Sequence, residues 1–210
     1  MLAEPSVTAV TSPVRLPVNG ERQLIISEPA SVGPSTLPEI RKVLSSIAQL
    51  SILSDEDFEA LLQLFQSHDY SAGSTLFYED DESDAVYFIA SGAIEVFKSN
   101  QSGKKMPLVV LRDSGLLGEI GLLSGDRRTA TARALNGVRV LELKRDAFEA
   151  ALAEGNPSVY RLTLAFARVL AHRLSTTDEK LFELFQNDVS DLLFKQLSEL
   201  QTRLLTRWAQ

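Results

Sequence analysis

The sequence predicts an α+β fold in which a small antiparallel β-barrel lies between helices at the two ends of the chain. Two observations carry this prediction. Between residues 70 and 143, short apolar runs alternate with turn residues, which is typical of barrels and sandwiches built from short strands. Before and after this region, apolar residues recur every three or four positions, which is the spacing of one helix face.

The composition narrows the functions that are open to the chain. It has 210 residues and a net charge of -7, which argues against a general binder of nucleic acid or of membrane surfaces. The absence of cysteine excludes disulfides, thiolate metal sites and iron–sulfur clusters. No apolar run approaches the roughly 20 residues of a membrane span, and the N-terminus lacks the pattern of a signal peptide. We therefore expect a cytoplasmic protein that makes no membrane contact.

Three regions are expected along the chain. Residues 1–37 contain five of the eight prolines and no sustained periodicity, so they predict an extended or disordered leader with a short strand at residues 23–27. Residues 38–156 predict the barrel domain with its flanking helices, and residues 157–210 predict long C-terminal helices.

The first helices are indicated by their start signals. Apolar residues recur at helical spacing over residues 40–50, after Pro38 near the helix start. Ser54 then offers a capping hydroxyl, and the three acids that follow it favour the first turn of a second helix. The apolar face of this second helix continues to about Ser67.

Short strands are expected in the central region. The polar stretch at residues 100–105 predicts a hairpin turn, and Asn136-Gly137 is a favoured two-residue hairpin turn between the last two strands. The expected strands lie within residues 70–78, 86–90, 94–97, 108–111, 131–135 and 138–143.

The C-terminal region begins with a helix at residues 145–154, and a much longer helix follows from Pro157. The barrel is too small to bury the apolar stripe of this long helix over its whole length, so we expect a second copy to cover it in a homodimer. The alternative is that the stripe folds back onto its own barrel. The stripe comprises Val159, Leu162, Ala165, Phe166, Val169, Leu170, Leu174 and Leu181, then Phe182, Phe185, Val189, Leu193, Leu197, Leu200 and Leu204.

The loop at residues 118–131 combines glycines, one carboxylate and an arginine in a pattern that suits a sugar phosphate. Gly118 and Gly121 let the backbone approach a ligand closely, and successive N–H groups in such a turn favour an anion. Arg128 can hold a phosphate through forked, charge-assisted hydrogen bonds. Ionised Glu119 only accepts hydrogen bonds, which suits a sugar hydroxyl. The alternative is a surface carboxylate and a surface arginine on an ordinary turn.

The order of helix, short-strand barrel, loop and C-terminal helices resembles the cyclic nucleotide-binding domain family over about residues 52–181. The resemblance implies a jelly-roll barrel in which Glu119 takes the ribose 2′-hydroxyl and Arg128 pairs with the cyclic phosphate. It also implies that backbone amides near Gly121 and Ala130 complete the cradle. The loop residues expected at the nucleotide are Gly118, Glu119, Ile120, Gly121, Arg128, Thr129 and Ala130.

Within this family, the chain is most similar to the effector domain of the CRP/FNR-like bacterial regulators. There, the positions that match Thr177 and Asp178 contact the base, the second one from across the dimer. Thr129 and Asp178 both offer hydrogen bonds to guanine, which favours cyclic GMP. Against this, a threonine at the position of Thr129 serves the phosphate in some cyclic AMP binders, and Asp178 also reads as a solvated acid beside Lys180. The choice between cyclic AMP and cyclic GMP stays open.

The resemblance implies a non-catalytic sensor whose nucleotide ligand changes the contact of the C-terminal helices with a partner protein. We expect no cofactor besides this ligand and no metal. No pattern of a helix-turn-helix reader follows the long helix, so we expect no DNA binding. The sequence contains no evident nucleophile–base pair or paired catalytic carboxylates, so we expect no enzyme. The alternatives are a CRP-like transcription regulator and a fold relative that senses another small ligand.

Overall fold

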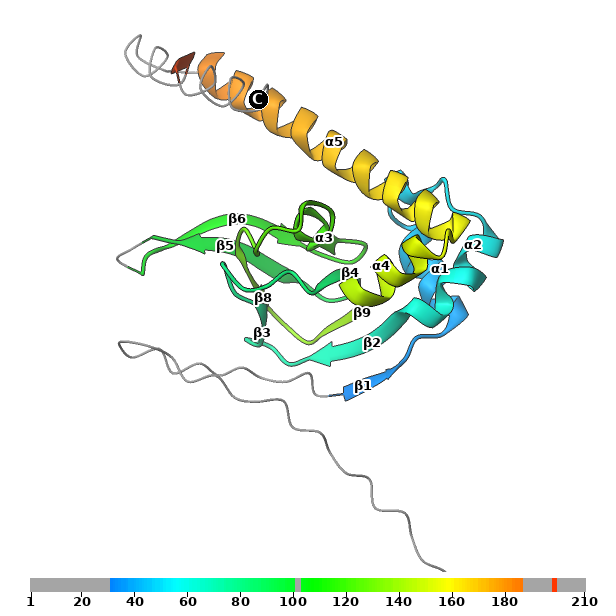
Figure 1. Ribbon diagram of the computed structural model, residues 1–210. Coiled ribbons are helices and arrows are strands. Elements are labelled where there is room, and N and C mark those ends of the chain that lie inside the picture. The colour runs from blue at the N-terminus through cyan, green and yellow to red at the C-terminus, as the bar shows by residue number, and fades with distance from the viewer. Residues whose placement is uncertain (1–30, 101–102, 187–197, 200–210) are drawn as a thin grey trace, which may run out of the picture.

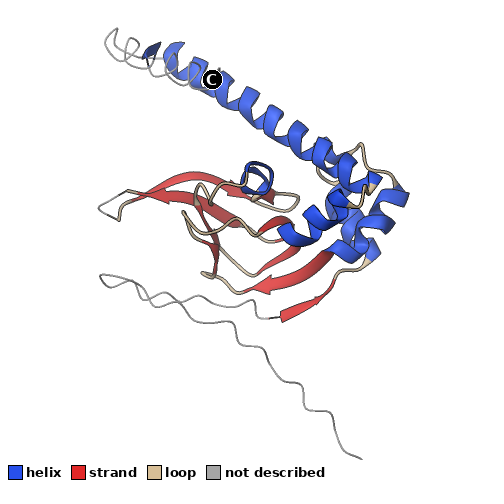
Figure 2. Ribbon diagram, viewed as in Figure 1, coloured by secondary structure: helices blue, strands red, loops and turns tan. Residues whose placement is uncertain are grey.

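The computed structural model of the chain describes residues 31–100, 103–186 and 198–199. In this part, antiparallel strands form two facing sheets, and most of the helices meet at one end of them, from which the long C-terminal helix extends (Figure 1, Figure 2). The predicted α+β class with antiparallel strands is thereby confirmed. The strand expected at residues 23–27 and the apolar stripe beyond Gln186 lie outside the described residues.

All neighbouring strands in the two sheets run antiparallel. The first sheet has the spatial order β1 (Ser31–Pro34), β2 (Phe65–Tyr70), β9 (Val138–Lys144), β4 (Ala85–Ser91) and β7 (Leu116–Leu117). The second has the order β3 (Thr75–Phe77), β8 (Thr131–Ala134), β5 (Ile94–Ser99) and β6 (Lys105–Leu111). The predicted hairpin between β5 and β6 is confirmed, because Ser99 pairs with Lys105 across it.

The helices are α1 (Leu37–Ser45), α2 (Asp55–Leu61), α3 (Glu119–Ser124), α4 (Arg145–Ala153) and α5 (Pro157–Gln186). Two short 3-10 turns accompany them, η1 (Ala48–Leu50) and η2 (Leu62–Leu64). Within the described residues, no helix has the length and apolar character needed to cross a bilayer.

The first sheet is buried on both faces. On one face it packs against α1, α2, α4 and the first half of α5, where the Phe88 ring lies 5.4 Å from Phe65 and 6.0 Å from Phe166 between ring centroids. On the other face it meets the second sheet inside the barrel, where Ile89 and Ala132 are fully buried. The first half of the α5 stripe, from Val159 to Val169, therefore folds back onto its own domain, as the alternative reading expected.

The second helix starts where predicted and ends earlier. The Ser54 hydroxyl accepts a hydrogen bond from the Asp57 amide at 3.3 Å, and the Asp57 carboxylate accepts one from the Ser54 amide at 2.8 Å, which forms a capping box. The helix stops at Leu61, and the prediction that it continues to about Ser67 is wrong. Phe65 begins β2 instead and pairs with Leu143 of β9, so its ring is buried by a strand in place of a helix.

The Asn136-Gly137 turn does not close a hairpin. β8 pairs with β3 and β5 in one sheet, whereas β9 pairs with β2 and β4 in the other. The Asn136 side chain accepts a hydrogen bond from the Ala93 amide at 2.8 Å, which ties the turn to the start of β5. The turn therefore moves the chain from one sheet to the other, and the predicted hairpin is wrong.

The end of the expected leader is ordered. Residues 31–34 form β1, which pairs with β2 along the edge of the first sheet. Thr36 then caps α1 by accepting a hydrogen bond from the Glu39 amide at 3.4 Å. The boundary predicted at residue 37 is therefore too late, because the last residues before it already belong to the barrel.

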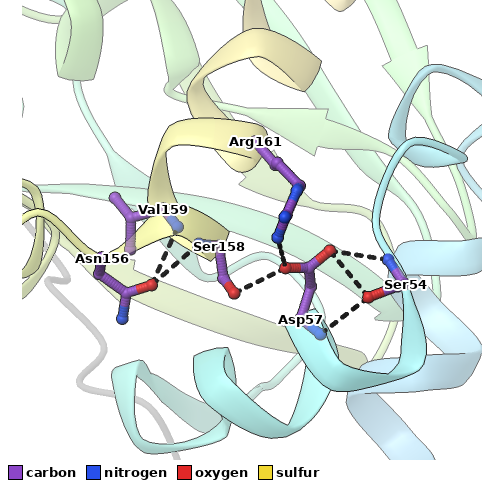
Figure 3. Close-up of polar contacts among 6 residues, drawn as sticks. All are labelled: Ser54, Asp57, Asn156, Ser158, Val159 and Arg161. Carbon is purple, nitrogen blue, oxygen red and sulfur yellow. Dashed lines mark hydrogen bonds and ion pairs between the residues drawn. The ribbon is translucent and has the colours of Figure 1, made fainter.

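A buried polar network fixes the start of α5 against α2 (Figure 3). The Asp57 carboxylate, only 1% exposed, accepts hydrogen bonds from the Ser158 hydroxyl at 2.6 Å and from Arg161 Nη1 at 2.5 Å. Burial raises the pKa of Asp57, but the hydrogen bonds from Ser158, Ser54 and Arg161 outweigh burial and hold it below its ordinary value of 3.8. Asn156 caps the helix by accepting a hydrogen bond from the Ser158 amide at 2.9 Å. An ionised carboxylate therefore anchors the base of α5.

Candidate functional site

The loop that carries the predicted site leaves the first sheet at β7 and forms the short helix α3, which the sequence analysis did not foresee. Gly118, with φ of 91°, precedes this helix, and a Cβ there would collide with Arg128 Nη1 and lie 2.8 Å from the Ala85 carbonyl oxygen. A Cβ at Gly121 would fall on the side chain of Ser83. Both glycines are therefore required by close packing around the loop.

Glu119, the first residue of α3, is almost fully buried and forms an ion pair with Arg173 of α5. Arg173 also donates a hydrogen bond from Nη2 to the Leu116 carbonyl oxygen at 2.5 Å. Burial raises the pKa of Glu119 above its ordinary value, although Arg173, its own backbone amide and Arg128 act in the opposite direction. The loop carboxylate and the long helix are thus in direct contact.

Arg128 is 3% exposed, and its guanidinium lies 4.2 Å from the ring centroid of Phe77 and 5.6 Å from that of Tyr87. Nη2 donates a hydrogen bond to the Asp84 carboxylate at 3.0 Å. Within the described part of the chain, Nε and Nη1 have no hydrogen-bond partner although both are buried. Buried, unpaired donors cost free energy, and an anion that accepts from them removes that cost.

The structure places Glu119 and Arg128, the two charged residues of the predicted sugar-phosphate site, near each other. Glu119 and Arg128 are close enough for the guanidinium charge to lower the carboxyl pKa. Ala130 is buried just before β8, whereas Thr129 and, on α3, Ile120 are exposed. A buried carboxylate beside a buried guanidinium with free donors suits a ligand that carries both hydroxyl and phosphate groups.

Thr177 and Asp178, the predicted base contacts, lie exposed on α5. The Thr177 hydroxyl donates to the Arg173 carbonyl oxygen of its own helix at 2.8 Å, one turn earlier. The described contacts do not join either residue to the loop. Arg173, one helical turn before Thr177, makes that connection. The base contacts of Thr177 and Asp178 stay a prediction.

Three side chains at the site escaped the sequence analysis. Arg173 pairs with Glu119, Asp84 pairs with Arg128, and Ser83 packs against Gly121. Asp84 is well exposed, and within the described residues its carboxylate forms an ion pair with Arg128. The sequence pattern gives little indication of these three contacts, because each residue lies on a different element from its partner.

A hollow of about 690 Å³ lies beside the loop, and neither Glu119 nor Arg128 lines it. Most of its lining residues are acids or bases: Glu82, Asp84, Asp126, Arg127, Lys144, Arg145 and Asp146, together with Ser83 and Gly125. Among the described residues, no group of three His, Asp or Glu side chains is placed to hold a metal ion. The predicted sugar-phosphate site therefore consists of Glu119 and Arg128 and does not include this hollow.

Comparisons with known proteins identify the class to which this site belongs. Residues 67–154 match the cyclic nucleotide-binding domain family. The chain is 31% identical over 148 residues to the CRP-like cAMP-activated global transcriptional regulator of Mycobacterium tuberculosis, a match that covers 70% of this chain and 64% of that protein. It is 31% identical over 151 residues to the cyclic AMP receptor protein of Thermus thermophilus, covering 70% of this chain and 68% of the relative.

A solved structure gives the same result. The Thermus thermophilus catabolite activator protein matches with a TM-score of 0.56 and 31% identity, covering 65% of this chain and 62% of that one. The chain belongs to the cyclic nucleotide-binding domain family, and the mycobacterial relative in that family is named as a CRP-like regulator. It spans slightly less than two thirds of the length of the mycobacterial relative.

Proposed function

We propose that the chain is a non-catalytic, cytoplasmic sensor that binds cyclic AMP or cyclic GMP at the α3 loop and signals through α5 to a partner protein. The observation that carries the proposal is the pair of buried donors on Arg128 that have no partner in the described part of the chain, near the buried Glu119. A cyclic phosphate supplies acceptors for Arg128, and the ribose 2′-hydroxyl supplies a donor for Glu119.

The ion pair between Glu119 and Arg173 supports signalling through α5. Arg173 lies on the long helix and holds both Glu119 and the Leu116 carbonyl oxygen. A ribose hydroxyl that donates to Glu119 shares the carboxylate with Arg173, so ligand binding and the placement of α5 depend on one group. A contact that differs between two helix placements is what a ligand-driven switch requires.

A line of exposed residues along one face of α5 supports a homodimer. Its positions alternate spacings of four and three residues, which is the pattern of a coiled-coil seam. Small residues in the middle of the line permit close approach, and β6 adds a further exposed apolar surface formed by Met106, Leu108, Val109 and Val110. The line consists of Tyr160, Leu164, Ala167, Ala171, Leu174, Asp178 and Leu181.

A dimer is testable by light scattering. The wild-type chain should show about twice the monomer mass, and Leu174→Glu should shift it towards the monomer, because charge repulsion and desolvation oppose burial at the seam. Leu135→Glu, which places the same charge at an exposed leucine outside α5, should leave the mass unchanged. A wild-type chain that stays monomeric at high micromolar concentration would contradict the dimer.

Cyclic AMP is the favoured ligand, because the mycobacterial and Thermus relatives carry it in their names. Calorimetric titration of the full chain with both nucleotides tests the function and the choice together. We expect tighter binding of cyclic AMP, and we expect Asp178→Ser to weaken cyclic GMP further, because the exposed carboxylate can accept from guanine. Glu179→Gln, a change at the adjacent exposed acid, is the control. Binding of neither nucleotide would overturn the proposed function, and tighter binding of cyclic GMP would reverse the ligand assignment.

A CRP-like transcription regulator is the second candidate, since the mycobacterial relative is named as one. Fluorescence anisotropy with labelled duplex DNA, with and without cyclic AMP, separates the two candidates. Ligand-dependent binding of the duplex at physiological salt would favour the regulator, and its absence would favour signalling to a protein.

A further inference from the structure

Arg145, at the start of α4, makes more contacts with the α3 loop than any role in its own helix requires. Its guanidinium donates from Nη2 to the Gly121 carbonyl oxygen and from Nη1 to that of Leu122 at 3.2 Å. Nε donates to the Ser83 carbonyl oxygen at 2.7 Å. A further ion pair with Glu149, at 3.3 Å, holds the side chain along α4.

One of the two α3 carbonyls, that of Leu122, is a group that a short helix leaves without a donor of its own. In α3 the Gly125 amide donates to Gly121 at 3.0 Å, while the Asp126 amide turns away to the Ser124 hydroxyl at 3.1 Å. The Leu122 carbonyl oxygen is therefore left for Arg145. A cation placed at the carboxyl end of a helix also interacts favourably with its dipole. Arg145 thus caps α3 from outside the loop.

The same residue holds the segment that carries Asp84. The Arg145 amide donates to the Asp84 carbonyl oxygen at 2.7 Å, next to the bond from its side chain to Ser83. Asp84 in turn accepts from Arg128 at 3.0 Å, and Ser83 is in contact range of Gly121. One arginine therefore fixes α3 and the Ser83–Asp84 segment relative to each other.

We infer that Arg145 is a positioning residue for the nucleotide site, an inference that rests on the proposed function. It sets the distance between α3, which carries Glu119, and Asp84, which orients Arg128. Arg173 holds the amino end of α3 and Arg145 holds its carboxyl end, so α3 is bracketed by arginines from α5 and from α4. Movement of α5 relative to the sheet would therefore act on the amino end of α3, and movement of α4 would act on its carboxyl end.

Hydrogen exchange of the unliganded full chain tests this role without any nucleotide. Arg145→Gln should speed amide exchange in the peptide spanning residues 119–125, because the α3 carbonyls lose their outside donor. Amides of β4 and β9 should keep their protection. The matched control is Arg139→Gln, which removes an exposed arginine bonded to Asp69 at 2.6 and 2.7 Å. Unchanged exchange in residues 119–125, or an equal acceleration in every segment, would overturn the inference.

Titration with cyclic AMP gives the second readout. Arg145→Gln should weaken binding roughly tenfold or more, the loss expected when hydrogen bonds from a charged group are removed. Combined with Asp84→Asn, the loss should be smaller than the sum of the two single losses, because Arg145 acts partly through Asp84. Full additivity, or wild-type affinity in Arg145→Gln, would contradict the positioning role. A wild-type chain that binds no nucleotide would instead contradict the proposed function, and the exchange measurement would still decide on Arg145.

Discussion

Replacing Arg128 with alanine should lower the affinity for cyclic AMP about a hundredfold or more, since truncating one member of a buried charge contact costs several kcal/mol. The side chain supplies the buried donors, Nε and Nη1, that have no partner within the described residues. Without them the cyclic phosphate is left with backbone groups and no opposing charge. Calorimetric titration of the full chain measures the loss.

Two further variants separate charge from packing at this position. Arg128→Met keeps an apolar side chain against Phe77 and Tyr87 but removes the charge, so it should lose binding as fully as Arg128→Ala. Arg127→Ala removes the neighbouring arginine, which is exposed and donates to the Asp80 carbonyl oxygen at 2.6 Å, and should bind nearly as the wild type does. Near-wild-type affinity in Arg128→Met would show that the guanidinium does not hold the phosphate.

Replacing Asp57 with alanine should lower the free energy of unfolding by about 2–4 kcal/mol, because a lost helix cap costs about 1 kcal/mol and lost hydrogen bonds to a buried charged group cost about 1.5–3 kcal/mol, while the half-exposed Arg161 is left solvated. The change removes the acceptor of the Ser158 hydroxyl and of Arg161, and it also removes half of the capping box with Ser54. The start of α2 and the base of α5 therefore each lose a stabilising contact. Urea unfolding at neutral pH measures the difference from the wild type.

Asp55→Ala is the matched control, because Asp55 lies in the same first turn but is largely exposed in its pair with Arg41. It should cost at most about 1 kcal/mol, as exposed pairs do. The pKa of Asp57 is lowered in the folded chain, so its contribution is present above its ordinary value of 3.8 and is lost as the pH falls below that value. The difference in the free energy of unfolding between the wild type and Asp57→Ala should therefore become smaller in acid. A difference that is unchanged below pH 3.8 would contradict this role of Asp57.

Local signals in the sequence predicted the starts of helices better than the ends or the partners of strands. Ser54 and the acids after it begin a helix because a cap and its first turn are neighbours along the chain. The position of Phe65 fits the apolar spacing of the same helix. Its pairing with Leu143, far along the chain, places it in a strand instead. Asn136-Gly137 has the chemistry of a hairpin turn, yet the strands on either side pair with other partners. Strand pairing is decided by distant residues, which local patterns do not contain.

The same distinction applies to the site. Glu119 and Arg128 were predictable because one loop carries both, at a spacing typical of the family. Arg173 stands 54 positions after Glu119, and Asp84 stands 44 positions before Arg128, so only the fold brings them into contact. Neither has a pattern that marks it, since an arginine on a long helix and an acid in a turn are ordinary surface residues.

Under the proposed function, the contact between Glu119 and Arg173 would couple two binding equilibria, that of the nucleotide and that of the partner. By thermodynamic linkage, a nucleotide that raises the affinity of α5 for a partner by some factor has its own affinity raised by the partner by the same factor. In the proposed sensor, the concentration of nucleotide needed for a response would therefore shift with the amount of partner present. A cell that made more of the partner would make the same chain sensitive to less nucleotide.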